Sequence, residues 1–132
     1  MSLNTLAGQD RNYWQAAAQN ARKRIETRLF IDGQFVEAAK GGRFTTINPA
    51  DGEPLAEMSA GTADDIDRAV AAARRAFRSG VWSRLAPRAR MDILFRFATL
   101  VDQHAQQLAV LETLDMGKPI ADVISADLPG VI

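Results

Sequence analysis

The sequence predicts a mixed α/β fold in which an N-terminal helix precedes short antiparallel strands, and further helices follow. Three observations support this prediction: helix-spaced apolar residues near the start, two turn signals dividing a short extended region, and helical spacing that resumes towards the C-terminus. Strands do not alternate with helices at regular intervals, so no βαβ unit is expected. The sequence shows no internal repeat and no low-complexity tract.

The first predicted helix runs from Gln9 to Glu26. This segment is rich in Ala, Gln and Arg and places Tyr13, Trp14 and Ala17 on one side. Residues 1–8 have no comparable pattern, so we expect a loose start to the chain.

The extended region begins with a predicted β-hairpin. Leu29–Ile31 and Gln34–Val36 flank Asp32-Gly33, a dipeptide suited to the positive φ angles of a type I′ turn. Beyond a second turn at 40–43, residues 44–47 are strand-like. Residues 48–54 are then dense in turn formers, and the chain is extended again over 55–58.

Two long helices are predicted next. Thr62 is a suitable N-cap, Asp64 and Asp65 complement the positive end of the helix that follows, and Gly80 stops it. A second helix is expected to start at Pro87 and to continue without a break to Met116. A last amphipathic turn or two, from Ile120 to Leu128, is expected before Pro129-Gly130.

Composition excludes several functional classes. The 16 basic and 16 acidic residues leave no net charge, so nothing favours binding to nucleic acid or to an anionic membrane. The absence of cysteine excludes disulfides, thiolate zinc sites and a cysteine nucleophile within this chain. No secretion signal or membrane-spanning apolar run is present, so we expect a cytoplasmic protein.

Most candidate functional residues have a simpler structural interpretation. His104 is the only histidine and is expected on the surface of a helix, since no second His or Cys can join it in a metal site. The acidic cluster at 64–67 is explained by helix capping. The arginines around Pro87 are explained by a solvated face.

Two segments leave a choice open. Around Thr46-Ile47-Asn48-Pro49, a hydroxyl and backbone carbonyls at a strand end are donors that hard cations prefer, but the residues alone favour a turn in which Asn48 bonds its own backbone. Asp115 lies in the last turn of a helix, where the helix dipole disfavours an acid. The residues alone favour a solvated acid whose charge Lys118 compensates, and the alternative is a ligand of a bound cation.

In their order and spacing, these segments resemble the N-terminal region of the aldehyde dehydrogenase superfamily over about residues 28–130. The matching pieces are Leu29–Phe35, Ile47–Gly52, Asp65–Phe77, Trp82, Arg88–Arg90 and Leu111–Pro119. The earlier helix, with Tyr13-Trp14-Gln15, is similar to the start of the bacterial γ-glutamyl-γ-aminobutyraldehyde dehydrogenases of putrescine breakdown. Met116 departs from the family, which usually has Thr there.

The resemblance implies an α/β, aldehyde dehydrogenase-like fold, with a helical extension over residues 1–28 and part of an NAD(P)-binding domain over 29–132. It implies oxidation of an aldehyde to a carboxylate with NAD or NADP, by a cysteine nucleophile and a general-base glutamate that this chain lacks. By position, Thr46, the Ile47 carbonyl and Asp115 would bind a structural K⁺ or Na⁺. The complete enzyme would be a dimer or tetramer.

We therefore expect no catalytic and no cofactor-binding residue in this chain, no activity from the chain alone, and poor solubility or partial folding. The alternative is a non-catalytic remnant or small helical interaction protein that associates with full-length subunits.

Overall fold

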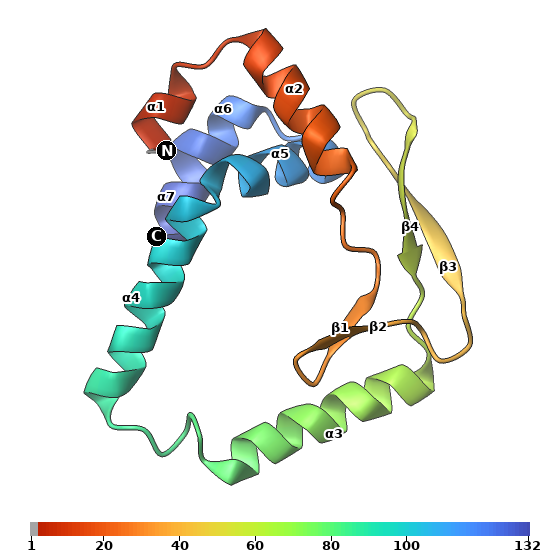
Figure 1. The fold of residues 1–132 in the computed structure, drawn as a ribbon, viewed down its shortest axis with the longest axis vertical. Coiled ribbons are helices and arrows are strands. Elements are labelled where there is room, and N and C mark those ends of the chain that lie inside the picture. Colours follow the sequence, from red (N-terminus) through yellow and green to blue (C-terminus); the bar gives the residue numbers. More distant parts are fainter. Residues whose placement is uncertain (1–2) are drawn as a thin grey trace. The chain divides into compact units, whose positions relative to one another are not determined.

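The computed structural model describes residues 3–132, drawn in Figure 1. They form two compact units, and the β3–β4 hairpin and α4 contribute residues to both. Unit 1 holds the chain up to Ile25, Thr46–Ala56 and Ile93–Ile132; unit 2 holds Glu26–Thr45 and Glu57–Asp92. The mixture of helices and short strands confirms the predicted mixed α/β class.

Unit 1 is mainly helical. Its helices are α1 (Leu3–Ala7), α2 (Arg11–Arg22), the end of α4 (Pro87–Gln103), α5 (Ala105–Met116), α6 (Ile120–Asp122), the π-helical turn η1 (Val123–Asp127) and α7 (Leu128–Val131). One apolar cluster joins Leu6 to Ala105, Ala109, Val123 and Leu128, and a second joins Ala21 to Val110 and Leu114.

The expectation of a loose start over residues 1–8 was wrong for the part that the structure describes. Residues 3–7 form α1, and the side chain of Leu6 is completely buried. A five-residue helix has little stability of its own, so packing against the rest of unit 1 must stabilise it. Met1 and Ser2 lie outside the described residues.

Helix α2 is shorter than predicted and packs on α5. The Asp10 carboxylate caps it by accepting the Tyr13 N–H at 2.8 Å. The Gln106 amide of α5 donates to the Tyr13 hydroxyl at 2.7 Å, and the Tyr13 and Trp14 rings meet edge to face. Figure 1 shows α2 lying beside α5.

In unit 2, the predicted hairpin is confirmed. Strands β1 (Leu29–Ile31) and β2 (Gln34–Val36) pair antiparallel with Phe30 opposite Phe35. Asp32 and Gly33 adopt φ angles of 56° and 78°, the positive values that a type I′ turn requires at both central positions.

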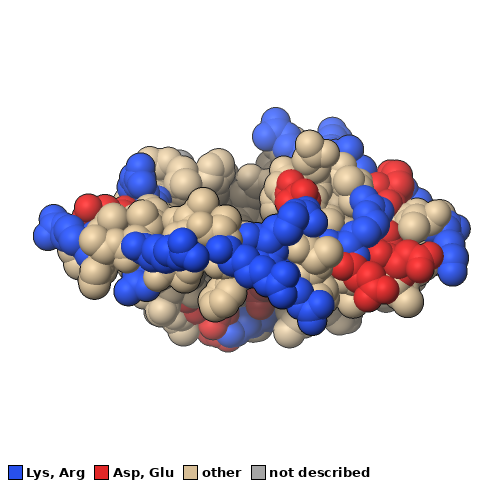
Figure 2. Space-filling model, turned by 90° about the horizontal axis from the view of Figure 1, so that it is seen from below, with Lys and Arg blue, Asp and Glu red and all other residues tan. Residues whose placement is uncertain are grey.

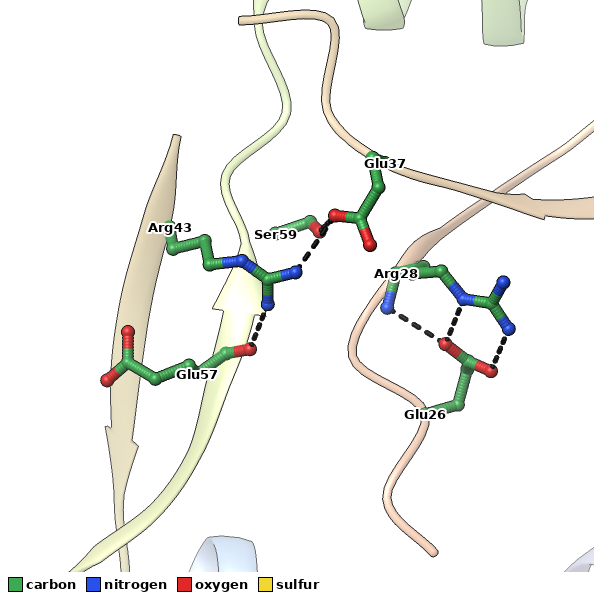
Figure 3. A network of polar contacts seen from close by, with 6 residues as sticks. All are labelled: Glu26, Arg28, Glu37, Arg43, Glu57 and Ser59. Carbon is green, nitrogen blue, oxygen red and sulfur yellow. Dashed lines mark hydrogen bonds and ion pairs between the residues drawn. The ribbon is translucent and has the colours of Figure 1, made fainter. Parts of the chain in front are cut away.

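Strands β3 (Arg43–Ile47) and β4 (Pro54–Ser59) form a second two-stranded sheet. Figure 3 shows how a polar network holds the chain after β2 against it. The Arg43 guanidinium donates to the Glu57 carbonyl oxygen at 2.8 Å and to the Glu37 carboxylate at 2.9 Å. The Ser59 hydroxyl donates to the same carboxylate at 3.2 Å.

Helix α3 (Ala63–Ser79) begins at the predicted cap. The Asp65 carboxylate, 1% exposed, accepts the Thr62 N–H and hydroxyl at 2.9 Å and also the N–H of Ala39. Burial of this charge is tolerated because its oxygens are hydrogen-bonded. The apolar side chains of Ile66 and Phe77 on α3 are exposed. Figure 2, seen from below Figure 1, shows many Lys and Arg side chains (blue) interspersed with acidic side chains (red).

The long helix predicted from Pro87 to Met116 is interrupted. Helix α4 ends at Gln103 and α5 starts at Ala105, with the exposed His104 between them at φ −101° and ψ 11°. The His104 N–H is shared between the carbonyls of Leu100 and Val101, so the hydrogen-bond ladder tightens at this point. Apolar spacing does not reveal such a break.

The last predicted helix continues further than expected. It passes through the π turn η1 and into α7, whose first turn contains Pro129. Within residues 3–132, no helix is long and apolar enough to cross a membrane.

Candidate functional site

The C-terminal end of α5 makes a close contact with the loop after β3. Gly117 ends the helix at φ 73°, and its N–H donates to the Thr113 carbonyl at 3.0 Å. A Cβ atom built on Gly117 would lie 2.7 Å from Cγ of Pro49. Only glycine satisfies both the left-handed backbone and this approach.

The loop that carries Pro49 is fixed by Asn48. The Asn48 side chain accepts the Ala50 N–H at 3.1 Å and donates to the Asp51 carboxylate at 2.9 Å, while its backbone N–H donates to the Glu53 carbonyl at 2.9 Å. Asn48 is 4% exposed. The turn predicted for Asn48 is therefore present, and it presents a rigid surface to α5.

The three residues predicted to bind a cation come from the two segments that meet at this contact. Ile47 and Asp115 each lie two residues from it, at Pro49 and Gly117 respectively. The half-buried Thr46 hydroxyl lies 3.5 Å from the Ala56 carbonyl, a long hydrogen bond. The family resemblance, and not residue spacing, had paired these two segments, and the Gly117–Pro49 contact had no sequence signal.

The predicted donor set consists of oxygen atoms only. It comprises a hydroxyl, a main-chain carbonyl and one exposed carboxylate, all oxygen donors of the kind that hard cations prefer. Residues 3–132 hold no group of three or more His, Cys, Asp or Glu side chains able to bind a metal ion. A single carboxylate balances one positive charge.

Lys118 does not compensate Asp115. Its ammonium pairs with the Asp127 carboxylate of η1, and this hydrogen-bonded pair raises the pKa of Lys118 above its ordinary value. The sequence left two explanations for the acid at the helix end, Lys118 or a bound cation. Lys118 is engaged with Asp127, so it does not supply the compensating charge.

For the other candidate residues, the structure shows contacts that stabilise helices or simple exposure to solvent. Asp65 serves the N-terminus of α3, as capping predicted, and Arg88 pairs with Asp92 one turn along α4 at 3.2 Å. His104 is exposed at the break between α4 and α5.

The chain matches the aldehyde dehydrogenase family over residues 35–132. It is 45% identical over 118 residues to the NADP/NAD-dependent aldehyde dehydrogenase PuuC of Escherichia coli (strain K12), covering 89% of this chain and 23% of that protein.

Solved structures of aldehyde dehydrogenases are also similar to this chain. The P. syringae indole-3-acetaldehyde dehydrogenase AldA, in complex with NAD⁺ and IAA, gives a TM-score of 0.83 at 51% identity, covering 89% of this chain and 23% of that one. The γ-glutamyl-γ-aminobutyraldehyde dehydrogenase of Burkholderia cenocepacia J2315 gives 0.84 at 43% identity, covering 98% and 24%. The chain spans about a quarter of the length of these relatives.

Proposed function

Because this chain belongs to the aldehyde dehydrogenase family, an oxidoreductase family, we propose that it supplies the N-terminal part of an enzyme that oxidises an aldehyde to a carboxylate with NAD or NADP. The observation that supports this proposal most strongly is the match of residues 35–132 to the family. An assay of NAD(P)H formation by a polypeptide that continues beyond Ile132 tests it, with an aldehyde panel as substrates.

We further propose that the 132 residues alone are inactive. They contain no cysteine to attack an aldehyde carbonyl, and they lack a Gly-rich loop of the kind that holds dinucleotide phosphates. The residues present therefore do not fit a dinucleotide, and no catalytic step is assigned to them. NAD(P)-dependent turnover by the purified chain, free of contaminating enzyme, would contradict this proposal.

Within the enzyme, the contribution proposed for this region is a K⁺ or Na⁺ site formed by Thr46, the Ile47 carbonyl and Asp115. The contact of Gly117 with Pro49 supports it, because the two segments that carry these ligands meet there. The bound cation would offset the charge of Asp115 at the negative end of α5 and hold the helix to the β3 loop.

Asp115→Ala tests the cation site. The urea midpoint of the parent should rise with KCl or NaCl beyond its rise with tetramethylammonium chloride at equal ionic strength, and Asp115→Ala should remove this difference. Asp67→Ala, which removes an exposed acid from α3, is the matched control and should preserve it. An unchanged cation dependence in Asp115→Ala would return Asp115 to a solvated acid.

The proposed substrate is γ-glutamyl-γ-aminobutyraldehyde, in putrescine degradation. The Burkholderia enzyme of that name supports it, because its match extends over 98% of this chain and so includes most of the N-terminal helices. The complete enzyme is expected to show a higher kcat/KM for this aldehyde than for indole-3-acetaldehyde. We also propose a cytoplasmic dimer or tetramer.

A second candidate function is association with full-length subunits as a small helical interaction protein. The exposed apolar side chains on α3 and α4 favour it, among them Ile66, Phe77, Leu94, Phe95 and Phe97. A stop codon after Ile132, together with co-purification of a full-length homologue, would select this candidate. An in-frame continuation that encodes a cysteine nucleophile would select the enzyme.

A further inference from the structure

A groove of about 220 Å³ lies between α2 and α5. Its walls are almost wholly apolar and include Trp14 and Ala18 of α2, Leu114 of α5 and Ile120 of α6. Figure 1 shows these helices side by side. Ligand sites typically combine such apolar walls with a few polar groups that fix orientation.

The only charged residue that lines the groove is Arg11. Its side chain is exposed and forms no ion pair with any residue in the range 3–132, and no acidic residue shares the lining. An unpaired guanidinium beside an apolar wall favours an anionic group, and its planar fork of N–H donors matches a carboxylate in particular.

The size of the groove restricts the ligand. A volume of 220 Å³ is below the range of about 300–1,000 Å³ that is typical of sites for drug-sized molecules. A ligand of about ten non-hydrogen atoms fits, and such a ligand is expected to bind with a Kd on the order of 0.1–1 mM.

We propose that this groove binds a small monocarboxylate with an apolar body, with the carboxylate at Arg11 and the body against Trp14, Leu114 and Ile120. None of the groove residues has a role in the proposed aldehyde oxidation, although α5 also carries Asp115 of the proposed cation site. Occupancy of the groove and the catalytic activity are therefore separate properties, and either proposal can fail without the other.

Trp14 fluorescence provides a direct test. Trp82→Phe leaves Trp14 as the sole tryptophan of the chain, and hexanoate is titrated up to about 10 mM, well above the expected Kd. Hexan-1-ol and hexylammonium, which share the apolar body but not the charge, serve as comparison probes. Circular dichroism confirms that each variant keeps the parent helix content.

Three variants in this background locate the carboxylate. Arg11→Gln should weaken hexanoate binding at least about tenfold, as expected when a charged hydrogen-bond donor is lost. Arg11→Lys should retain part of the affinity, because the positive charge remains. The control is Arg24→Gln, which removes an exposed arginine that does not line the groove and should leave the Kd unchanged.

Saturable binding of hexanoate alone, weakened only by substitution of Arg11, supports the proposal. Equal affinity for all three probes would show an adventitious apolar contact and overturn it. An unchanged Kd in Arg11→Gln, or no saturable signal from the parent, would also overturn it.

Discussion

The contact between Gly117 and Pro49 makes a quantitative prediction for Gly117→Ala. Alanine at φ 73° incurs about 1–2 kcal/mol of left-handed backbone strain. Its Cβ would also lie 2.7 Å from a carbon of the rigid Pro49 ring, and overpacking of this kind costs about 1–3 kcal/mol. The expected loss in free energy of unfolding is therefore about 2–5 kcal/mol.

Gly52→Ala is the matched control. Gly52 has the same φ of 73°, but no heavy atom lies within 4 Å of the position that its Cβ would occupy. It should therefore lose only the strain of about 1–2 kcal/mol. The difference between the two variants isolates the steric contact between α5 and the β3 loop.

Urea unfolding followed by circular dichroism measures both variants, in the parent and in a Pro49→Ala background. Removal of the proline ring should abolish most of the excess cost of Gly117→Ala and leave that of Gly52→Ala unchanged. If Gly117→Ala is no more destabilising than Gly52→Ala, the two segments are not in contact, and the proposed cation site loses its structural support.

Three further predictions concern single side chains. Thr113→Val should stabilise the chain by about 1 kcal/mol in urea unfolding, because the buried Thr113 hydroxyl has no hydrogen-bond partner among residues 3–132; a loss of stability would contradict this. Thr62→Ala should cost about 1 kcal/mol through loss of the α3 cap, and an unchanged urea midpoint would refute the role of the cap. NMR titration should show the pKa of Glu26 lowered to about 2, chiefly by the hydrogen bonds from Arg28, and Arg28→Gln should return it towards its ordinary value.

The pH dependence of stability is expected to follow Asp65. Hydrogen bonds, first among them that from the Thr62 N–H, hold the pKa of its carboxyl below the ordinary value. The folded state then binds this proton less readily than the unfolded state. The contribution is therefore present above about pH 3.9 and is lost as the pH falls through the folded pKa. Asp65→Asn should flatten this part of the stability profile, and an unchanged profile would exclude Asp65 as its source.

The parts of the fold that were predictable are those determined by neighbouring residues. Asp32-Gly33 specifies its own turn through backbone conformation, and Thr62 and Asp65 are one helical turn apart. Helix α1 was missed because its stability comes from burial of Leu6 among residues about 100 positions away in sequence. The break at His104 was missed because apolar spacing continues across it.

The candidate site was predictable only in part. The type of each proposed ligand is evident from the sequence, but spacing along the chain does not indicate that residues 46–49 meet residues 115–117. The resemblance to a family supplied that pairing. The sequence left open whether Lys118 or a bound cation compensates Asp115, and it gave no sign that the fold of η1 brings Asp127 to Lys118.

The π turn η1 also determines how the end of the chain tolerates a change in length. A π turn accommodates one residue more than an α turn, and each residue of an α-helix advances the rotation by about 100°. Because the π turn absorbs one extra residue, deletion of one residue between Val123 and Asp127 should convert it into an α turn without the rotation of about 100° that a deletion elsewhere in the helix would cause, so Leu128 should stay buried. Homologous chains that lack this residue should carry an uninterrupted α-helix here and an apolar side chain at the position equivalent to Leu128.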